Sequence, residues 1–113
     1  MIDRLRGRAA FDRLRAEGRR HGSGPIRLVS RLDSTQNARI AFAIPRTVGN
    51  AVERNRIRRR IRAILDEEAR MNPDFPARGD HLIRITSPID DWSPTTLRST
   101  MHDLLHPPAD EAR

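Results

Sequence analysis

Residues 38–65 read ARIAFAIPRTVGNAVERNRIRRRIRAIL, and they hold a strand pattern followed by a helix pattern. Ile40, Phe42 and Ile44 alternate with small or charged residues, which is typical of a strand with one buried face. Pro45 ends this strand, because proline has no N–H to donate to a neighbouring strand. The sequence therefore predicts a strand that leads directly into a helix.

The helical part extends from Gly49 to about Ala69. Its large apolar residues recur at i, i+4, i+7 and i+8, so they form one stripe along a helix. These residues are Ile57, Ile61, Ile64 and Leu65. We expect this stripe to pack against the apolar face of the preceding strand.

Residues 8–17 predict a short helix, and residues 26–32 predict another strand by their alternation. Residues 21–25 between them indicate a turn or the entry to a short strand. We expect the strand over residues 26–32 to pair with that over residues 40–44 as an antiparallel hairpin. The side chains expected on the face away from the core are Arg27, Val29, Arg31, Arg39, Ala41 and Ala43.

The last third predicts a short strand over residues 81–85 and a final helix. Ser93 suits the N-cap of that helix and Pro94 its first position. Its apolar side chains, which should join the core, are Leu97, Met101, Leu104 and Leu105. The element order indicates a small α/β (α+β) sandwich of helices packed on a sheet. We expect one domain over residues 1–106 and a disordered tail over residues 107–113.

All 22 basic side chains are arginine, and the net charge is +7 at pH 7. Residues 1–62 carry 17 arginines and five acidic residues, whereas residues 63–113 carry five arginines and ten acidic residues. Positive charge concentrated in one region attracts a polyanion. We expect a nucleic acid partner, with an anionic membrane surface as the alternative. A GC-rich coding bias explains most of the absence of lysine, so the positions of the arginines are more informative than their type.

The chain has no cysteine, which excludes disulfides, thiolate nucleophiles and zinc sites of the common cysteine-containing types. No apolar run approaches the roughly 20 residues that span a bilayer, and the N-terminus MIDRLRGR lacks a hydrophobic signal core. We therefore expect a cytoplasmic protein without membrane contact.

Residues 54–62 read RNRIRRRIR, with six arginines in nine positions. Like charges three or four residues apart on a helix repel one another. The cluster also lies toward the N-terminal half of the helix, where the helix dipole disfavours positive charge. A sequence selected for helix stability alone would place these residues elsewhere, so we infer that the arginines bind a ligand. The alternative is a solvated surface.

Arg54 and Asn55 have distinctive positions in this cluster. The projected angle of Arg54 falls within the apolar stripe, so either the end of the helix overhangs the sheet there or Arg54 reaches over the sheet edge toward a bound strand. Asn55 has both a donor and an acceptor, which would allow it to bridge neighbouring side chains or to contact a nucleotide.

No group of residues indicates catalysis by the protein itself. The four histidines do not have the spacing of metal ligands, and they are His21, His81, His102 and His106. Asp90 and Asp91 are adjacent, but they precede a helix cap in an expected loop. An independent nuclease is disfavoured, because no carboxylate pair or histidine accompanies the basic helix.

The stretch quoted above resembles the signature of the bacterial ribonuclease P protein family. A strand leads into VGNAV, residues 48–52, and an Arg-Asn-Arg helix follows. The positions that agree in type and spacing are Val48, Gly49, Asn50, Ala51, Val52, Arg54, Asn55, Arg56, Arg59 and Arg62. Weaker similarity extends over most of the chain.

The resemblance implies a two-layer αβββαβα fold of the ribosomal protein S5 domain 2-like class. It adds a short strand near residues 19–24, where the pattern indicates only a turn. It also implies a left-handed βαβ crossover through the long helix, although parallel connections are generally right-handed.

For function, the resemblance implies the protein subunit of an endoribonuclease, a hydrolase whose RNA subunit performs the catalysis with Mg²⁺. The partners would be that catalytic RNA and precursor tRNA, whose 5′ leader is removed. It implies no catalytic residue, metal or cofactor held by the protein. The implied RNA-binding residues are Arg46, Arg54, Asn55, Arg56, Arg58, Arg59 and Arg62. The implied leader cleft comprises Phe11, Arg15, Arg27, Val29, Ala41 and Ala43.

Three positions depart from the family pattern. Arg15 and Val29 stand where aromatic residues are common, and Thr47 stands where a second basic residue often follows the first. Phe11 is then left as the stacking platform, with charge from Arg15 and Arg27. A ribosomal or other structural RNA-binding protein is the alternative function, because it would share the charge polarity but not the VGNAV and Arg-Asn-Arg motifs.

Overall fold

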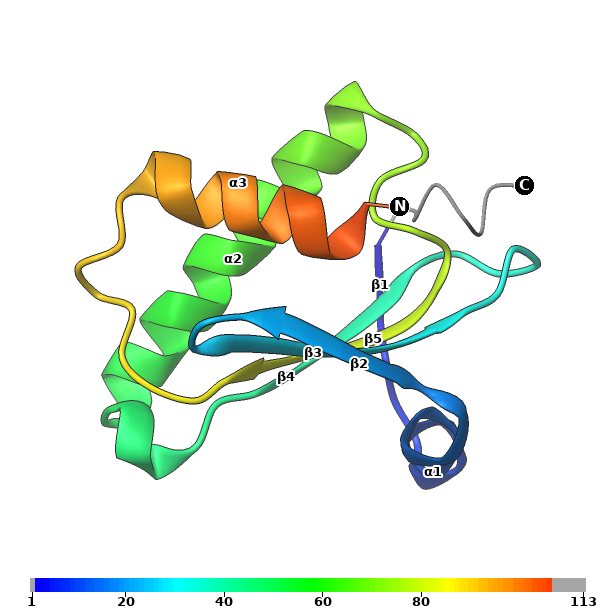
Figure 1. Ribbon diagram of the computed structural model, residues 1–113, viewed down its shortest axis with the longest axis horizontal. Coiled ribbons are helices and arrows are strands. Elements are labelled where there is room, and N and C mark those ends of the chain that lie inside the picture. The colour runs from blue at the N-terminus through cyan, green and yellow to red at the C-terminus, as the bar shows by residue number, and fades with distance from the viewer. Residues whose placement is uncertain (1, 107–113) are drawn as a thin grey trace.

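A five-stranded sheet runs through the centre of the computed structural model, which describes residues 2–106, and helices lie on both of its faces (Figure 1). Helices α2 and α3 cover one face, and α1 lies against the other. The strands are β1 (Asp3–Arg4), β2 (Arg19–Ser23), β3 (Ile26–Leu32), β4 (Arg39–Ala43) and β5 (Gly79–Ile85). The helices are α1 (Arg8–Glu17), the 3₁₀ turn η1 (Arg46–Val48), α2 (Ala51–Met71) and α3 (Pro94–Leu105).

The strand order is β1-β4-β5-β3-β2, so the predicted hairpin between β3 and β4 is wrong. Strand β5 lies between them, antiparallel to β3 and parallel to β4. It takes the centre because Ile83 and Ile85 are fully buried there. The link over residues 33–38 can cross one intervening strand, because two strand spacings amount to only about 10 Å.

The mixed α+β fold class and the order αβββαβα are confirmed, and one further strand, β1, precedes α1. Strand β2 is the short strand near residues 19–24 that the family resemblance implied. Strand β1 was not predicted, because two residues show no periodicity. It pairs in parallel with β4, and its flanking residues Ile2 and Leu5 are buried on opposite faces of the sheet. The connection from β4 through α2 to β5 joins adjacent parallel strands, and its left-handed sense stays a prediction.

Helix α2 begins at Ala51, two residues after the predicted start, and a capping box precedes it. The Asn50 side chain accepts a hydrogen bond from the Glu53 N–H at 2.8 Å, and the Glu53 carboxylate accepts one from the Asn50 N–H at 2.9 Å. These bonds satisfy two backbone donors that the helix itself leaves unpaired.

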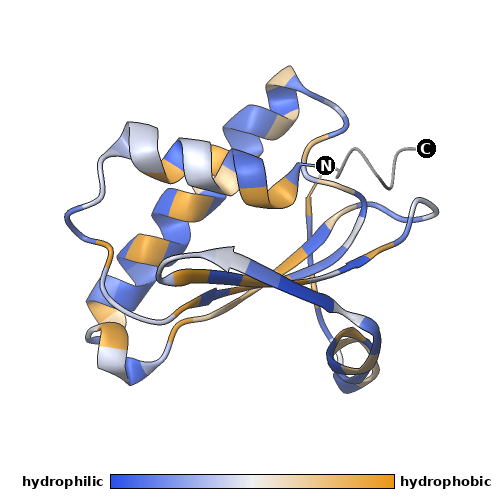
Figure 2. Ribbon diagram, viewed as in Figure 1, coloured by the Kyte–Doolittle hydropathy of each residue, from blue (hydrophilic) through white to orange (hydrophobic). Residues whose placement is uncertain are grey.

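The main core lies between the sheet and the pair α2 and α3, whose hydrophobic segments face the sheet (Figure 2). All four residues of the predicted α2 stripe belong to it. Helix α3 contributes three fully buried side chains, whereas Leu104 is only partly buried. The three are Leu97, Met101 and Leu105.

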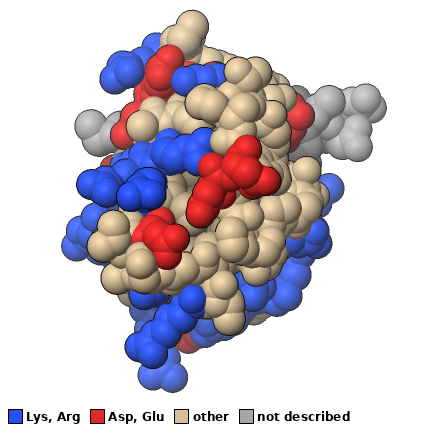
Figure 3. Space-filling view, turned by 90° about the vertical axis from the view of Figure 1, so that its left-hand side faces the viewer, with Lys and Arg blue, Asp and Glu red and all other residues tan. Residues whose placement is uncertain are grey.

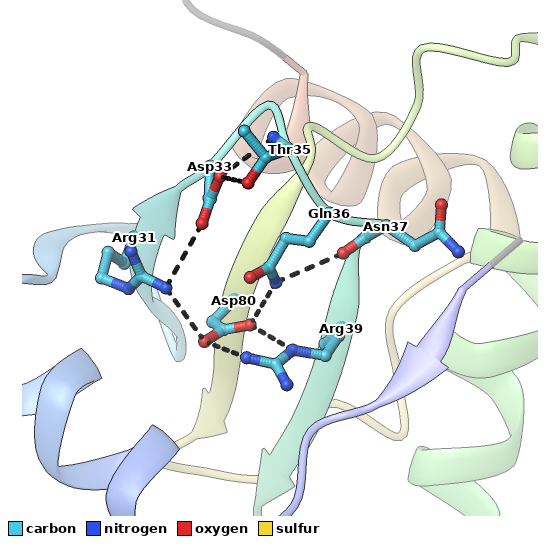
Figure 4. Close-up of polar contacts among 7 residues, drawn as sticks. All are labelled: Arg31, Asp33, Thr35, Gln36, Asn37, Arg39 and Asp80. Atoms are coloured by element: carbon cyan, nitrogen blue, oxygen red, sulfur yellow. Dashed lines mark hydrogen bonds and ion pairs between the residues drawn. The ribbon is translucent and has the colours of Figure 1, made fainter.

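A charged network ties three strands together on the α1 face of the sheet (Figure 4). The Asp80 carboxylate is fully buried and accepts hydrogen bonds from Arg39 at 2.7 and 2.8 Å and from Gln36 at 2.8 Å. Arg31 lies 3.8 Å from Asp80 and also 3.8 Å from Asp33. Burial by itself would raise the pKa of Asp80, but these hydrogen bonds and arginine charges outweigh it and hold the pKa below its usual value.

Within residues 2–106, no helix is both long enough and apolar enough to cross a membrane. The tail predicted over residues 107–113 lies outside the described residues, so the proposed domain limit stays a prediction.

Candidate nucleic-acid interface

The arginines of α2 divide into exposed and anchored side chains. Arg56 and Arg59 are exposed, and neither has a carboxylate partner in the described part of the chain. Arg62 is anchored by a hydrogen bond to the Ile2 carbonyl at 2.8 Å and an ion pair with Asp66 at 3.4 Å. Arg60 donates to the Trp92 carbonyl at 2.9 Å. The helix therefore presents both fixed and adaptable guanidinium groups.

Arg54 and Asn55 are neighbours on α2 but differ in burial and in contacts. Arg54 is partly buried, and its Nε atom is buried without a hydrogen-bond partner. Asn55 accepts a hydrogen bond from Arg58 at 2.6 Å, so it bridges to a neighbouring side chain. A buried donor without a partner is costly, so Arg54 would gain from a side-chain movement that brings its Nε atom to an acceptor.

Within the described residues, the acidic half of the chain leaves Arg56 and Arg59 of the basic helix exposed. Near the end of α2, Glu67 and Glu68 pair with Arg98 of α3 at 3.1 and 2.9 Å. The end of the molecule where α2 begins carries both signs of charge, with carboxylates lying between arginine side chains (Figure 3). Arg46 and Thr47 lie exposed in η1, just before α2.

A hollow of about 740 Å³, which we call the edge pocket, lies between the edge of β4 and helix α2. It contains three of the predicted RNA-binding arginines and also Ala41. The lining residues are Arg4, Leu5, Arg6, Ile40, Ala41, Phe42, Arg58, Arg59 and Arg62.

A second hollow of about 170 Å³, the α1 groove, lies between α1 and the opposite face of the sheet. It contains three residues of the predicted leader cleft: Phe11, Arg15 and Val29. Val29 is only 7% exposed because it packs against Leu14, so it forms the floor and offers little surface to a ligand. Arg15 donates to Asp12, which neutralises part of its charge.

The other predicted cleft residues lie farther along the same face. Ala41 is partly buried against the apolar cluster beneath α1. Ala43 and Arg84 line an adjoining hollow of about 270 Å³. Arg84 also lines the α1 groove, so it lies between the two hollows.

Arg27 and Arg84 form a like-charged pair across neighbouring strands. They are register partners on β3 and β5, both are exposed, and neither has a carboxylate partner within the described residues. Directly opposed like charges destabilise a sheet. The Arg27 side chain passes close over Gly22, where an added Cβ would meet its Cδ at 3.0 Å. A bound anion would offset the repulsion.

Two basic residues of this surface, Arg20 and Arg84, were not among the predicted site residues. Both line the α1 groove. Alternation along β5 puts Arg84 on the face of Asp80 and Leu82, but only the pairing of β5 with β3 brings it beside Arg27. Arg20 could not be placed because the pattern indicated no full strand there.

The family model described as Ribonuclease P matches residues 2–108, which is almost the whole chain. This chain belongs to the ribonuclease P protein family.

Curated relatives agree with this family. The ribonuclease P protein component of Kocuria rhizophila is 34% identical over 71 residues, which cover 63% of this chain and 63% of the relative. That of Gluconacetobacter diazotrophicus is 39% identical over 71 residues, covering 62% and 61%. The chain thus spans slightly less than two thirds of the length of these relatives.

Solved structures share the fold. The RNase P protein from Thermotoga maritima has a TM-score of 0.71 at 22% identity, covering 91% of this chain and 94% of that protein. The RNase P protein of Staphylococcus aureus has a TM-score of 0.69 at 17% identity, covering 90% and 91%. At these identities the likeness shows the fold, including the mixed sheet that positions both basic surfaces.

For this ribonuclease P family member, the described residues contain no group of three or more histidine, aspartate or glutamate side chains arranged to hold a metal ion. His81 is buried, and burial lowers its pKa despite its contact with the Ala77 carbonyl at 2.6 Å. Its other ring nitrogen contacts Ser30 at 2.8 Å. These contacts give His81 a role in packing between β3 and β5.

Proposed function

We propose that this chain is the protein subunit of ribonuclease P, and that it binds the catalytic RNA and the 5′ leader of precursor tRNA. In this role it assists the endonucleolytic removal of the leader in the cytoplasm. The observation that carries the proposal is the arginine-rich start of α2 within a chain of this family.

Helix α2 is the proposed contact with the catalytic RNA. Its exposed arginines can bind phosphates directly, whereas Arg58 and Arg62 are already oriented by Asn55 and Ile2. Orienting a side chain before binding reduces the entropy lost on association. Arg46 and Arg56 would extend this contact toward the beginning of the helix.

The α1 face is the proposed site of the single-stranded leader. Phe11 offers a ring for base stacking, and Arg20, Arg27 and Arg84 offer charge for phosphates. Stacking together with positive charge binds single strands with little base preference. Because Val29 forms the floor, we expect this protein to hold the leader more by charge than by stacking.

Chemistry is assigned to the RNA subunit, with Mg²⁺ bound there. The protein would contribute positioning of both RNAs and neutralisation of their charge. This division needs no nucleophile or general base from the chain.

Reconstitution tests the proposal. The purified chain alone should leave precursor tRNA uncut, and adding the catalytic RNA of its host at low Mg²⁺ should produce cleavage at the mature 5′ end. The RNA alone at the same Mg²⁺ concentration is the control. Cleavage by the protein alone, or no stimulation of the RNA, would contradict the proposal, and the second result would favour another structural RNA-binding role.

A further inference from the structure

The edge pocket combines an apolar floor with a basic rim. Leu5 and Ile40 are buried beneath it, whereas Phe42 and Ala41 are partly exposed to the hollow. Five arginines surround this floor, and no acidic residue lines it. The volume of about 740 Å³ is within the usual range of about 300–1,000 Å³ for small-molecule sites. Such a lining suits a ligand with one flat apolar part and one anionic part.

The pairing of β1 with β4 ends at Ile40, beside the pocket. Strand β1 pairs only with Arg39 and Ile40, and the Leu5 N–H donates to the Ile40 carbonyl at 2.9 Å. Alternation along the strand directs the N–H and C=O of Phe42 toward the same edge, beyond the end of β1. One donor and one acceptor thus lie beside the Phe42 ring, as a nucleobase edge would require.

The rim is partly fixed in place before any ligand arrives. Arg62 is held by Ile2 and Asp66, and Arg58 is held by Asn55. Arg4 and Arg6 approach from the chain segment on the other side of the hollow, and both are exposed. Guanidinium groups therefore flank the floor from α2 and from the N-terminal segment, where they can bind phosphates on both sides of a base.

We infer that the edge pocket binds one unpaired nucleotide that projects from a structured RNA, with its base against Phe42 and its phosphates between the two groups of arginines. This rests on the proposed function, and it assigns Arg4, Arg6 and Phe42 a role in RNA recognition. An added peptide strand fits less well, because only Phe42 and Ile44 remain on that edge before Pro45.

Two RNA hairpins test the inference, identical except that one carries a single bulged nucleotide. Dissociation constants are measured for both at the same salt concentration. The parent protein should bind the bulged hairpin about fivefold or more tightly than the paired one, as expected for one stacked base. With 2-aminopurine at the bulge, binding should also change its fluorescence.

Two variants locate this preference. F42L keeps the apolar packing but removes the ring, so it should abolish the bulge preference and retain affinity for the paired hairpin. R4Q/R6Q should also reduce the preference. R13Q/R70Q removes the same charge from exposed positions outside the pocket and should keep the preference.

The outcomes distinguish failure of the pocket assignment from failure of the proposed function. Equal affinity of the parent for both hairpins overturns the pocket assignment while leaving the proposed function intact, whereas no affinity for either hairpin contradicts the proposed function itself. Loss of the preference in R13Q/R70Q would attribute it to total charge and overturn the assignment. Competition against the bulged RNA is measured with a polyglutamate peptide and with the paired hairpin. If the peptide displaces the bulged RNA at the lower concentration, the pocket is assigned to a protein partner instead.

Discussion

Asp80 is a buried carboxylate at the centre of the sheet, paired with Arg39 and close to Arg31. Because removing one partner leaves buried charge uncompensated, D80N should lower the free energy of unfolding by about 3 kcal/mol. Urea denaturation followed by the fluorescence of Trp92 measures this. D103N, at an exposed position on α3, is the matched control and should leave stability unchanged.

Protonation of Asp80 should make the free energy of unfolding depend on pH in the acid range. Its pKa is lower in the folded state than the ordinary value of 3.8, so its contribution is fully present above pH 3.8 and is lost as the pH falls through the folded pKa. The stability difference between parent and D80N should therefore narrow in acid. A difference that stays constant well below pH 3.8 would show that Asp80 does not titrate in this way.

Replacing Arg84 should change stability and RNA binding in opposite directions. Removing the charge opposite Arg27 in R84L should raise the free energy of unfolding by a few tenths of a kcal/mol. The same change should weaken binding of a single-stranded RNA and reduce the slope of log affinity against log salt by about 0.7. R13L is the control on α1. A loss of stability in R84L would mean that the two arginines do not repel each other appreciably.

Helix α2 combines a buried apolar stripe with the arginines that we propose to bind RNA. Its apolar stripe is buried, and the capping box fixes its start at Asn50. R59A, at an exposed position, should weaken binding to the catalytic RNA and reduce the salt slope by about one without changing stability. R62A should reduce both binding and stability, because Arg62 also anchors Ile2 and Asp66.

R70A, near the end of α2, is the control for these two variants. Salt titration of RNA binding and urea denaturation are measured on all three. Unchanged salt slopes in R59A and R62A would place both side chains off the interface.

Prediction from the sequence succeeded where an element carries its own periodicity. The α2 stripe, the Ser93 cap of α3 and the alternation of β3 and β4 are all local patterns, and the structure confirms them. The neighbours of each strand are set by contacts between distant segments, so the predicted hairpin was wrong and β1 was missed. The family resemblance supplied β2, which local pattern could not.

The residues of the candidate site were also predicted where the pattern is local and missed where contacts join distant segments. The α2 arginines are adjacent in sequence and were predicted as a cluster. The pair Arg27 and Arg84 depends on the register of β3 with β5, and the edge pocket depends on where β1 ends. Neither can be derived from composition or spacing within one element.

At the scale of the whole molecule, the sheet separates two basic surfaces. Helices α2 and α1 lie on opposite sides of it, so the contacts proposed for a structured RNA and for a single strand do not overlap on these two helices (Figure 1). Under the proposed function, this arrangement would let the positive charge of the first 62 residues bind two RNAs without competition between them.

Independence of the two surfaces is testable with R59A, R84L and the double variant. R59A should weaken binding of the catalytic RNA alone, and R84L should weaken binding of a leader oligonucleotide alone. Because Arg59 lines the edge pocket and Arg84 lines other hollows, the effects in the double variant should add within about 0.5 kcal/mol. Each affinity is measured with and without the other RNA at saturation. If either variant weakens both RNAs equally, or if one RNA displaces the other, the two surfaces form one continuous site and the separation by the sheet has no functional consequence.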